Sequence, residues 1–247
     1  MSRDGTDAQG LYRDHGVVLR TYKLGEADRI VVLMTEHHGE VRAVAKGARR
    51  TKSRFGARLE PPTHAVVQLY HGRSELDTVT QADTVDHFRA LRDDLQGLGR
   101  AMTMLEATDQ VALEREPNAA LYRLLVGALR TLAARPSPLV VAGFLWKLLA
   151  LEGVAPVLDH CVVCGAPDRL VAFDLSEGGA VCRDDRRGQP LSPPALALLR
   201  DVLGGRLGAA LDAPVTPATA EVDRLAVRAV EHHLERRLRS VGVLDGA

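Results

Sequence analysis

Three cysteines and one aspartate have a spacing that suits a metal ion. Cys161 and Cys164 form a C-x2-C pair, and after seventeen intervening residues Cys182 is followed by Asp185 at the same interval. The zinc-ribbon pattern has a second C-x2-C pair at this separation, and a carboxylate oxygen is also a zinc ligand. We therefore predict one structural zinc ion per chain, held by Cys161, Cys164, Cys182 and Asp185. Asp184 and His160 compete for the fourth position, and a packed knuckle of free thiols is the alternative.

Signs of catalysis are missing around this cluster and elsewhere in the sequence. A catalytic zinc needs an open coordination position and a nearby acid or base, and the nearest candidate, Glu177, has no motif around it. The chain has no G-x-x-x-x-G-K-[ST], H-E-x-x-H or G-x-S-x-G motif. The pairs His37-His38 and His232-His233 are predicted to be surface pairs, because neighbouring side chains on a helix or strand point in different directions. These observations predict a protein that is not an enzyme and has no small-molecule substrate.

A run of cations between residues 46 and 58 predicts contact with nucleic acid. It has no acidic residue before Glu60, and Phe55 lies inside it. Cations release counterions from phosphates, and one aromatic ring can stack on a base. Cations on neighbouring segments extend the predicted surface, although a solvated loop without a partner is the alternative. The predicted binding residues are Lys46, Arg49, Arg50, Lys52, Arg54, Phe55, Arg58, Arg20, Lys23 and Arg42.

The composition leaves this local pattern to decide the matter. The chain has 247 residues with 32 basic and 32 acidic side chains, so its formal charge is zero. The longest apolar run, residues 139–146, is far too short to cross a bilayer. Residues 1–10 lack the apolar run of a signal peptide, and an odd, clustered set of cysteines is unlike a secreted disulfide framework. We therefore predict a cytoplasmic, nucleoid-associated protein with no membrane partner.

Strand-like patterns in the first third of the chain predict a barrel that positions the basic loop. Five short runs rich in Val, Leu, Thr and Tyr occupy residues 16–24, 29–36, 40–47, 63–72 and 74–83. In the third run, Val41, Ala43 and Ala45 alternate with more polar positions. Five closely spaced strands suit a small antiparallel OB-fold barrel. We assign residues 1–10 to a flexible tail and 11–84 to this domain.

Helical spacing takes over in residues 85–247 and predicts the α part of an α+β protein. A leucine stripe runs from Leu121 to Leu132, with Pro117 in the first turn. Ser137 and Ser192 precede prolines and are predicted N-caps. The last helix has its apolar face from Val222 to Leu238. All three cysteines lie in a zinc-ribbon-like insertion at about residues 154–190, and four arginines of the last helix are candidates for a second cationic surface: Arg224, Arg228, Arg236 and Arg239.

Residues 15–72 also resemble a known family. The marks are G-E-A-D-R after the first strand, T-E-x-H-G-E-V-R-A-V-A-K-G, and the following A-R-R-x-K-S-R-F. Together they resemble the N-terminal domain of the bacterial DNA-repair family RecO. The stretch L-E-G-V-A-P-V-L-D-H-C-V-V-C-G is similar to the family's entry into its zinc knuckle. Residues 86–135 and 192–247 match only in helical character.

The resemblance implies an OB-fold followed by a helical domain with a zinc-ribbon insertion. It implies binding of single- and double-stranded DNA and annealing of complementary strands. It also implies partnership with RecR and with single-strand-binding protein, which promotes RecA loading during recombinational repair. Two positions depart from the family: Asp185 stands where a fourth cysteine is usual, and Pro62 where an aromatic is usual. Two other functions stay open: an RNA chaperone on the same barrel, or a protein–protein adaptor that works through its helical domain.

Overall fold

The computed structural model describes residues 10–212 and 214–240, which form two compact units. The first unit contains the described residues up to Arg89 together with Val111–Val126, and the second contains Ala90–Gln110 and the chain from Gly127 onward. The predicted tail lies outside the described residues except for Gly10, which begins the first strand. The predicted division between residues 84 and 85 stays a prediction, and no sequence pattern indicated that residues 111–126 belong to the first unit.

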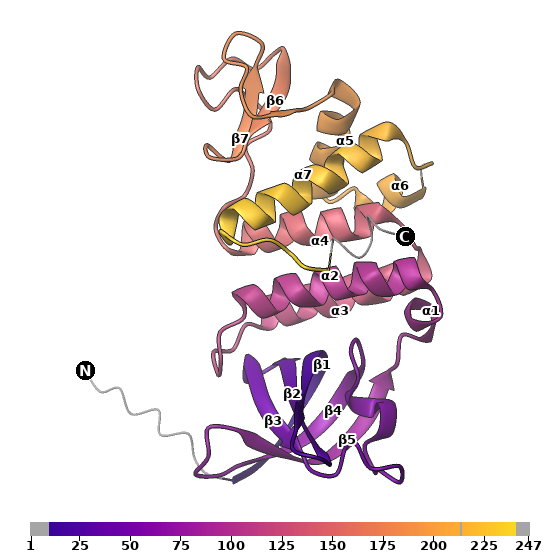
Figure 1. The fold of residues 1–247 in the computed structure, drawn as a ribbon. Coiled ribbons are helices and arrows are strands. Elements are labelled where there is room, and N and C mark those ends of the chain that lie inside the picture. The colour runs from indigo at the N-terminus through magenta and orange to yellow at the C-terminus, as the bar shows by residue number, and fades with distance from the viewer. Residues whose placement is uncertain (1–9, 213, 241–247) are drawn as a thin grey trace, which may run out of the picture. The chain divides into compact units, whose positions relative to one another are not determined.

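Five strands of the first unit close into a barrel (Figure 1). They are β1 (Gly10–Leu24), β2 (Asp28–Thr35), β3 (Glu40–Ala45), β4 (His64–His71) and β5 (Asp77–Asp86). The strand order is β1-β2-β3-β5-β4, with β4 returning to β1. The closing β3–β5 contact is parallel and has two paired positions, Ala43 with Asp77 and Val44 with Thr78. The predicted five-stranded OB-fold barrel is confirmed.

Alternation along each strand fills the barrel, because successive side chains point to opposite faces. Val41, Ala43 and Ala45 are buried in its core, as predicted, together with Val31 and Leu33 of β2. The first strand starts at Gly10, earlier than expected. Its opening residues pair with the end of β4, but their side chains are largely exposed and lack the apolar pattern that marks a strand.

Residues 111–126 are held against the barrel by backbone and side-chain hydrogen bonds. The backbone N–H of Glu40 donates to the Leu113 carbonyl, and that of Arg115 donates to the Glu40 carbonyl. Helix α3 (Ala119–Ala134) follows. Asn118 accepts a hydrogen bond from the backbone N–H of Leu121 and so caps this helix. Pro117 therefore lies before the helix and not in its first turn, which corrects our expectation.

The second unit is built around a buried apolar helix, α4 (Pro138–Leu151). Ten of its residues are buried, and it lies against the last helix, α7 (Pro217–His233) (Figure 1). The remaining helices are α1 (Arg89–Arg92), α2 (Leu95–Val111), α5 (Pro193–Leu203) and α6 (Leu207–Asp212). The hydroxyls of Ser137 and Ser192 cap α4 and α5, as predicted. No helix of the described chain is long and apolar enough to cross a membrane.

The last helix is shorter than its pattern indicated. It ends at His233, so Leu238 is buried beyond the helix, and Arg236 and Arg239 are not on its surface. The chain turns at Glu235, which has φ +51°, and the backbone N–H of Arg236 donates to the Glu231 carbonyl to close the turn. Farther on, Glu106 of α2 accepts hydrogen bonds from the backbone N–H groups of Arg239 and Ser240. The apolar pattern of the sequence continues past the end of the helix because the turn buries Leu238 at a spacing similar to that of a helix.

The cysteine insertion forms a small three-stranded sheet of its own. Its strands are β6 (Leu170–Asp174), β7 (Gly179–Cys182) and β8 (Gln189–Pro190), in the order β7-β6-β8. Phe173 of β6 contacts Trp146 of α4, with ring centroids 5.6 Å apart. The Arg200 guanidinium of α5 donates to the Leu158 carbonyl, 3.1 Å from Nε. The predicted α+β class, with a helical part that carries a ribbon-like insertion, is confirmed.

Candidate nucleic-acid interface and metal centre

The basic loop joins β3 to β4 and is fixed to the barrel at two points. At its start, the backbone N–H of Gly47 donates to Asp28 Oδ1 at 2.8 Å. The Arg49 guanidinium then donates to the Gly25 and Glu26 carbonyls, each at 3.1 Å. These contacts place the loop beside the short turn between β1 and β2. In OB-folds, that turn borders the ligand face.

Phe55 provides the second point of attachment. Its side chain is 1% exposed and lies in the barrel core with Leu59 of the short 3-10 helix η1 (Gly56–Leu59). The expectation that Phe55 stacks on a base is therefore wrong, because a ring inside the core offers no face to a ligand. The sequence pattern was ambiguous here: an aromatic among cations is equally suited to anchor a loop.

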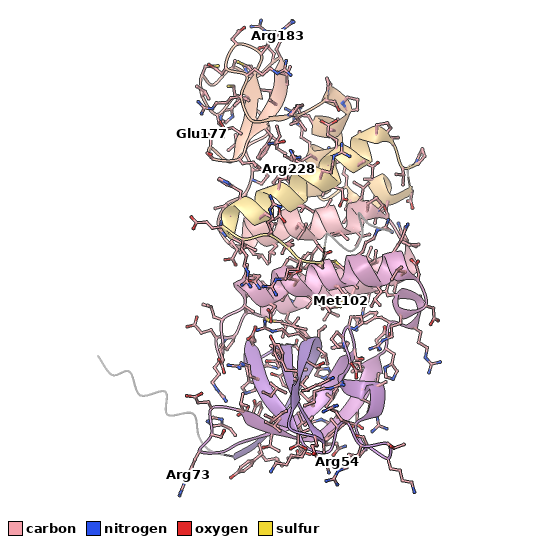
Figure 2. All side chains as sticks on the ribbon, in the orientation of Figure 1. Arg54, Arg73, Met102, Glu177, Arg183 and Arg228 are labelled. Atoms are coloured by element: carbon pink, nitrogen blue, oxygen red, sulfur yellow. The ribbon has the colours of Figure 1, made fainter. Side chains whose placement is uncertain are left out.

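The cations of the loop remain on the surface around this anchor. Lys46, Arg49, Arg50, Lys52, Arg54 and Arg58 are all exposed. Arg54 projects outward in Figure 2, and its guanidinium also lies 4.8 Å from the centroid of the Phe55 ring. Arg58 donates to the Arg54 carbonyl at 2.8 Å, and Arg49 is bound to the neighbouring turn. Arg50, Lys52 and Arg54 lie in the middle of the loop, and like Lys46 they are exposed and can meet phosphates.

Tyr22, an exposed aromatic residue that we did not predict to bind nucleic acid, lies on the outer wall of the barrel nearby. Val31 and Ala43 are paired and point into the barrel, so their neighbours Ile30 and Val44 point outward. Tyr22 of β1 is paired with Ile30 and therefore lies on the same outer face. Tyr22 is 44% exposed, and the Arg20 guanidinium lies 5.3 Å from its ring centroid. Knowledge of the strand register would have identified Tyr22 as outward-facing, because it pairs with Ile30, the neighbour of the inward-facing Val31.

The other predicted strand cations divide between this wall and the barrel end. Arg20 and Arg42 share the outer face with Tyr22, in register through Val32. Arg42 also lies 3.9 Å from the Glu114 carboxylate, which reduces its net field. Lys23 is exposed and pairs with Arg29 at the end of the β1–β2 ribbon, where Arg29 forms an ion pair with Glu60.

In the insertion, the four predicted metal-binding residues come together. Their ligand atoms all lie within 4.8 Å of one another. Cys164 Sγ is 3.7 Å from Cys182 Sγ, while Asp185 Oδ2 is 3.4 Å from Cys161 Sγ and 3.3 Å from Cys182 Sγ. With Zn–S near 2.3 Å and Zn–O near 2.0 Å, a tetrahedral site has sulfurs about 3.8 Å apart and sulfur–oxygen distances of about 3.5 Å. The donor set and its spacing fit a zinc ion.

The structure also separates the three candidates for the fourth position. Asp184 is exposed and lies 3.4 Å from the Arg169 guanidinium, while His160 Nδ1 lies 2.9 Å from Asp159. Of the three, Asp185 is the one whose carboxylate reaches the thiols. Figure 2 shows Arg183 at the tip of the insertion, pointing away from the sheet.

Crowding of acidic groups changes the protonation of the cluster. Hydrogen bonds from the cysteine thiols hold the pKa of Asp185 below its usual range. The hydrogen bond to Asp185 raises the pKa of the Cys164 thiol to about 12. Burial acts to raise the pKa of Cys161, but backbone N–H groups of Cys164, Cys182 and Val163 outweigh it and lower that pKa. A cation bound among these groups would stabilise all the thiolates together.

The two histidine pairs differ from each other. His232 and His233 are exposed at the end of α7, as predicted. His37 is exposed and His38 partly exposed, as predicted for a surface pair, but both rings reach one buried carboxylate: Nδ1 of His37 lies 2.9 Å and Nδ1 of His38 2.6 Å from Asp14. The argument from opposite directions failed because these residues lie in the bend between β2 and β3, where strand alternation does not apply.

Comparison with known proteins covers both units. The family model described as recombination protein O N terminal matches residues 9–88, and the model described as recombination protein O C terminal matches residues 92–241. A protein of Frankia casuarinae named DNA repair protein RecO is 44% identical over 243 residues, which cover 96% of this chain and 99% of that relative.

Proposed function

Since this chain belongs to the RecO family of DNA repair proteins, we propose that it binds single- and double-stranded DNA and anneals complementary strands without covalent chemistry. The observation that carries the proposal is the loop of residues 46–58, which exposes six cations around one buried anchor. An anchored loop holds its cations at fixed positions, so less ordering entropy is lost when phosphates bind.

The wall beside the loop supports single-strand binding in particular. Tyr22 offers an exposed ring, and Arg20 and Arg42 lie on the same face in the neighbouring row of paired residues. Cations that follow a backbone next to an aromatic platform are the general means by which OB-folds bind single strands. Double-stranded DNA hides the base faces that such a ring needs, so it would depend on the cations alone.

Annealing follows if phosphates of two strands are neutralised together, because their mutual repulsion slows encounter. The loop cations would hold one strand. For the second, Arg224 and Arg228 of α7 are exposed, and Arg228 donates to Gln189 of the insertion. Since Arg236 and Arg239 lie beyond α7, the alternative source of a second cationic surface is another copy of the chain.

The test of the binding site is a salt series with a labelled single-stranded oligonucleotide, read by fluorescence anisotropy. Replacing Arg50, Lys52 and Arg54 together by Ala should reduce the slope of log affinity against log salt by about 2, at about 0.7 per phosphate contact. The matched control replaces three other exposed arginines, Arg89, Arg123 and Arg130, and should bind like the unmodified protein. The proposal is contradicted if affinity does not depend on salt, or if the loop variant binds as tightly as the unmodified protein.

Two further assays separate the alternatives. Annealing of complementary oligonucleotides, followed by fluorescence quenching, should need no ATP, leave both strands uncut and fall at high salt; strand cleavage would make the protein an enzyme. An RNA competitor that displaces DNA at equal concentration would favour the RNA chaperone. We extend the proposal to RecA loading with RecR on DNA coated by single-strand-binding protein. If the protein is instead an adaptor, the loop variant should bind these proteins as well as the unmodified protein does.

A further inference from the structure

The bend between β2 and β3 places two imidazoles and a second carboxylate around the buried carboxylate of Asp14. The Asp14 side chain is 0% exposed, while those of His37 and His38 are 68% and 42% exposed. The ring of His37 contacts one Asp14 oxygen and the ring of His38 contacts the other. Glu36 adds its carboxylate: ligand atoms of Asp14, Glu36 and His37 lie within 4.8 Å of one another.

The backbone holds this arrangement in place. The N–H of His15 donates to Asp14 Oδ1 at 2.8 Å and that of His37 to Oδ2 at 3.0 Å, so both oxygens have fixed directions. Thr35 accepts from the backbone N–H of His38 and donates to the Gly39 carbonyl. Gly39 has φ +66°, and a Cβ there would meet the Glu116 carbonyl oxygen at 2.1 Å. The bend is therefore a rigid turn and presents both rings to the same carboxylate.

We propose that Asp14, Glu36, His37 and His38 form a second metal site, which takes a divalent transition-metal ion of the zinc, cobalt or nickel type. Imidazole nitrogens and carboxylate oxygens are ligands for such ions, whereas Mg²⁺ and Ca²⁺ prefer oxygen alone. The bound ion replaces the protons that the imidazoles share with Asp14. The exposed rings give it a path from solvent, and the buried carboxylate supplies a fixed negative charge beneath it.

The site is chemically unlike the cysteine cluster, and cobalt distinguishes the two. The full-length protein, freed of metal by chelator and dialysed, is titrated with Co²⁺ and followed by absorption. The first equivalent should produce thiolate-to-cobalt charge transfer from the cysteine cluster. A second equivalent should add ligand-field absorption without more charge transfer, because its ligands contain no sulfur. Saturation at one equivalent would overturn the proposal.

Variants assign the second equivalent. His37→Ala with His38→Ala should lose it and keep the charge-transfer band, while His232→Ala with His233→Ala, a matched adjacent pair elsewhere, should keep both. Glu36→Gln, a smaller change at a partly exposed position, should lower the affinity for the second equivalent of Co²⁺ about tenfold or more. Circular dichroism checks that each variant is folded. A second equivalent that survives in both the His37/His38 variant and Glu36→Gln would place the ion elsewhere and overturn the assignment.

Discussion

The loop of residues 46–58 and the insertion of residues 154–190 use charged groups in opposite ways. The loop buries one aromatic ring and turns its cations to solvent. The insertion buries Cys161 and Cys182, gathers their thiols around Asp185, and exposes Arg183 and Arg186. Exposed cations can meet a macromolecule, whereas converging ligands of which two are buried suit an ion that belongs to the fold. The comparison supports the proposed nucleic-acid ligand of the loop and the predicted structural ion of the insertion.

The largest effect is expected from breaking the inward-facing cluster. Cys161→Ser should abolish zinc retention and lower the free energy of unfolding by several kcal/mol, because binding energy at such a site is folding energy. Metal content is measured by elemental analysis and stability by urea denaturation. Val163→Ala, at an exposed position between the two thiols of the first pair, is the control and should change neither. Unchanged stability in Cys161→Ser, with no metal in the unmodified protein, would show that packing holds the knuckle.

A second variant tests the same cluster by adding a thiolate ligand instead of removing one. Asp185→Cys completes a four-thiolate site, so it should hold zinc longer against a chelator than the unmodified protein. Asp184→Cys is the control, since Asp184 lies with Arg169 and not with the thiols. Equal retention in both variants would contradict the assignment of Asp185 as the fourth ligand.

Phe55 is the point at which the outward-facing loop depends on the core. Phe55→Ala should destabilise the barrel by about 3–5 kcal/mol, through lost burial and the cavity left behind. Phe55→Leu, which keeps most of the volume, should cost less than about 1.5 kcal/mol. Thermal denaturation measures both. If Phe55→Ala kept its stability but lost DNA affinity, the ring would be a binding group after all.

A buried ionic group gives the barrel its own dependence on pH. Asp77 is fully buried and accepts hydrogen bonds from Tyr12, His71 and Arg115. Burial alone would raise its pKa, but these partners lower it below the usual range. A lowered carboxyl pKa stabilises the fold above the pKa of the unfolded chain, near 3.9, and this contribution is lost as the pH falls toward the folded value.

Asp77→Asn should therefore destabilise the protein by about 3 kcal/mol at pH 7, where it leaves Arg115 without its carboxylate. The difference from the unmodified protein should begin to shrink below about pH 4, where Asp77 of the unfolded chain takes up a proton. It should disappear only below the lowered pKa of the folded state, where both forms carry a neutral side chain. Thermal melts across this range measure it. Asp83→Asn, at an exposed position on the same strand, should show no such difference.

Local patterns predicted most of the fold, and contacts distant in sequence explain the rest. Strand alternation indicated that Val41, Ala43 and Ala45 line a core, and Ser-Pro pairs marked two helix starts; each depends on neighbouring residues alone. The cysteine spacing brought four ligands together because a ribbon fixes their register. By contrast, the burial of Phe55 and the shared carboxylate of His37 and His38 depend on strands that lie far away in the sequence, so a pattern of residue types could not decide them.

The smallest expected effect concerns Tyr22, and it tests whether the outer barrel wall binds single strands together with the basic loop. Tyr22→Ala should weaken single-strand affinity by about 1–3 kcal/mol, the range for loss of one base stack. It should leave the salt slope unchanged, because no cation is removed, and leave stability within about 0.5 kcal/mol, because the ring is largely at the surface. Tyr70→Ala is the matched control, since Tyr70 is 47% exposed on β4. Tyr22→Phe should bind normally, because stacking needs the ring and not the hydroxyl. If Tyr22→Ala and Tyr70→Ala bind alike, strand recognition rests on the loop cations alone; if Tyr22→Ala instead reduces the salt slope, its effect is exerted through Arg20, whose guanidinium would lose the ring that positions it.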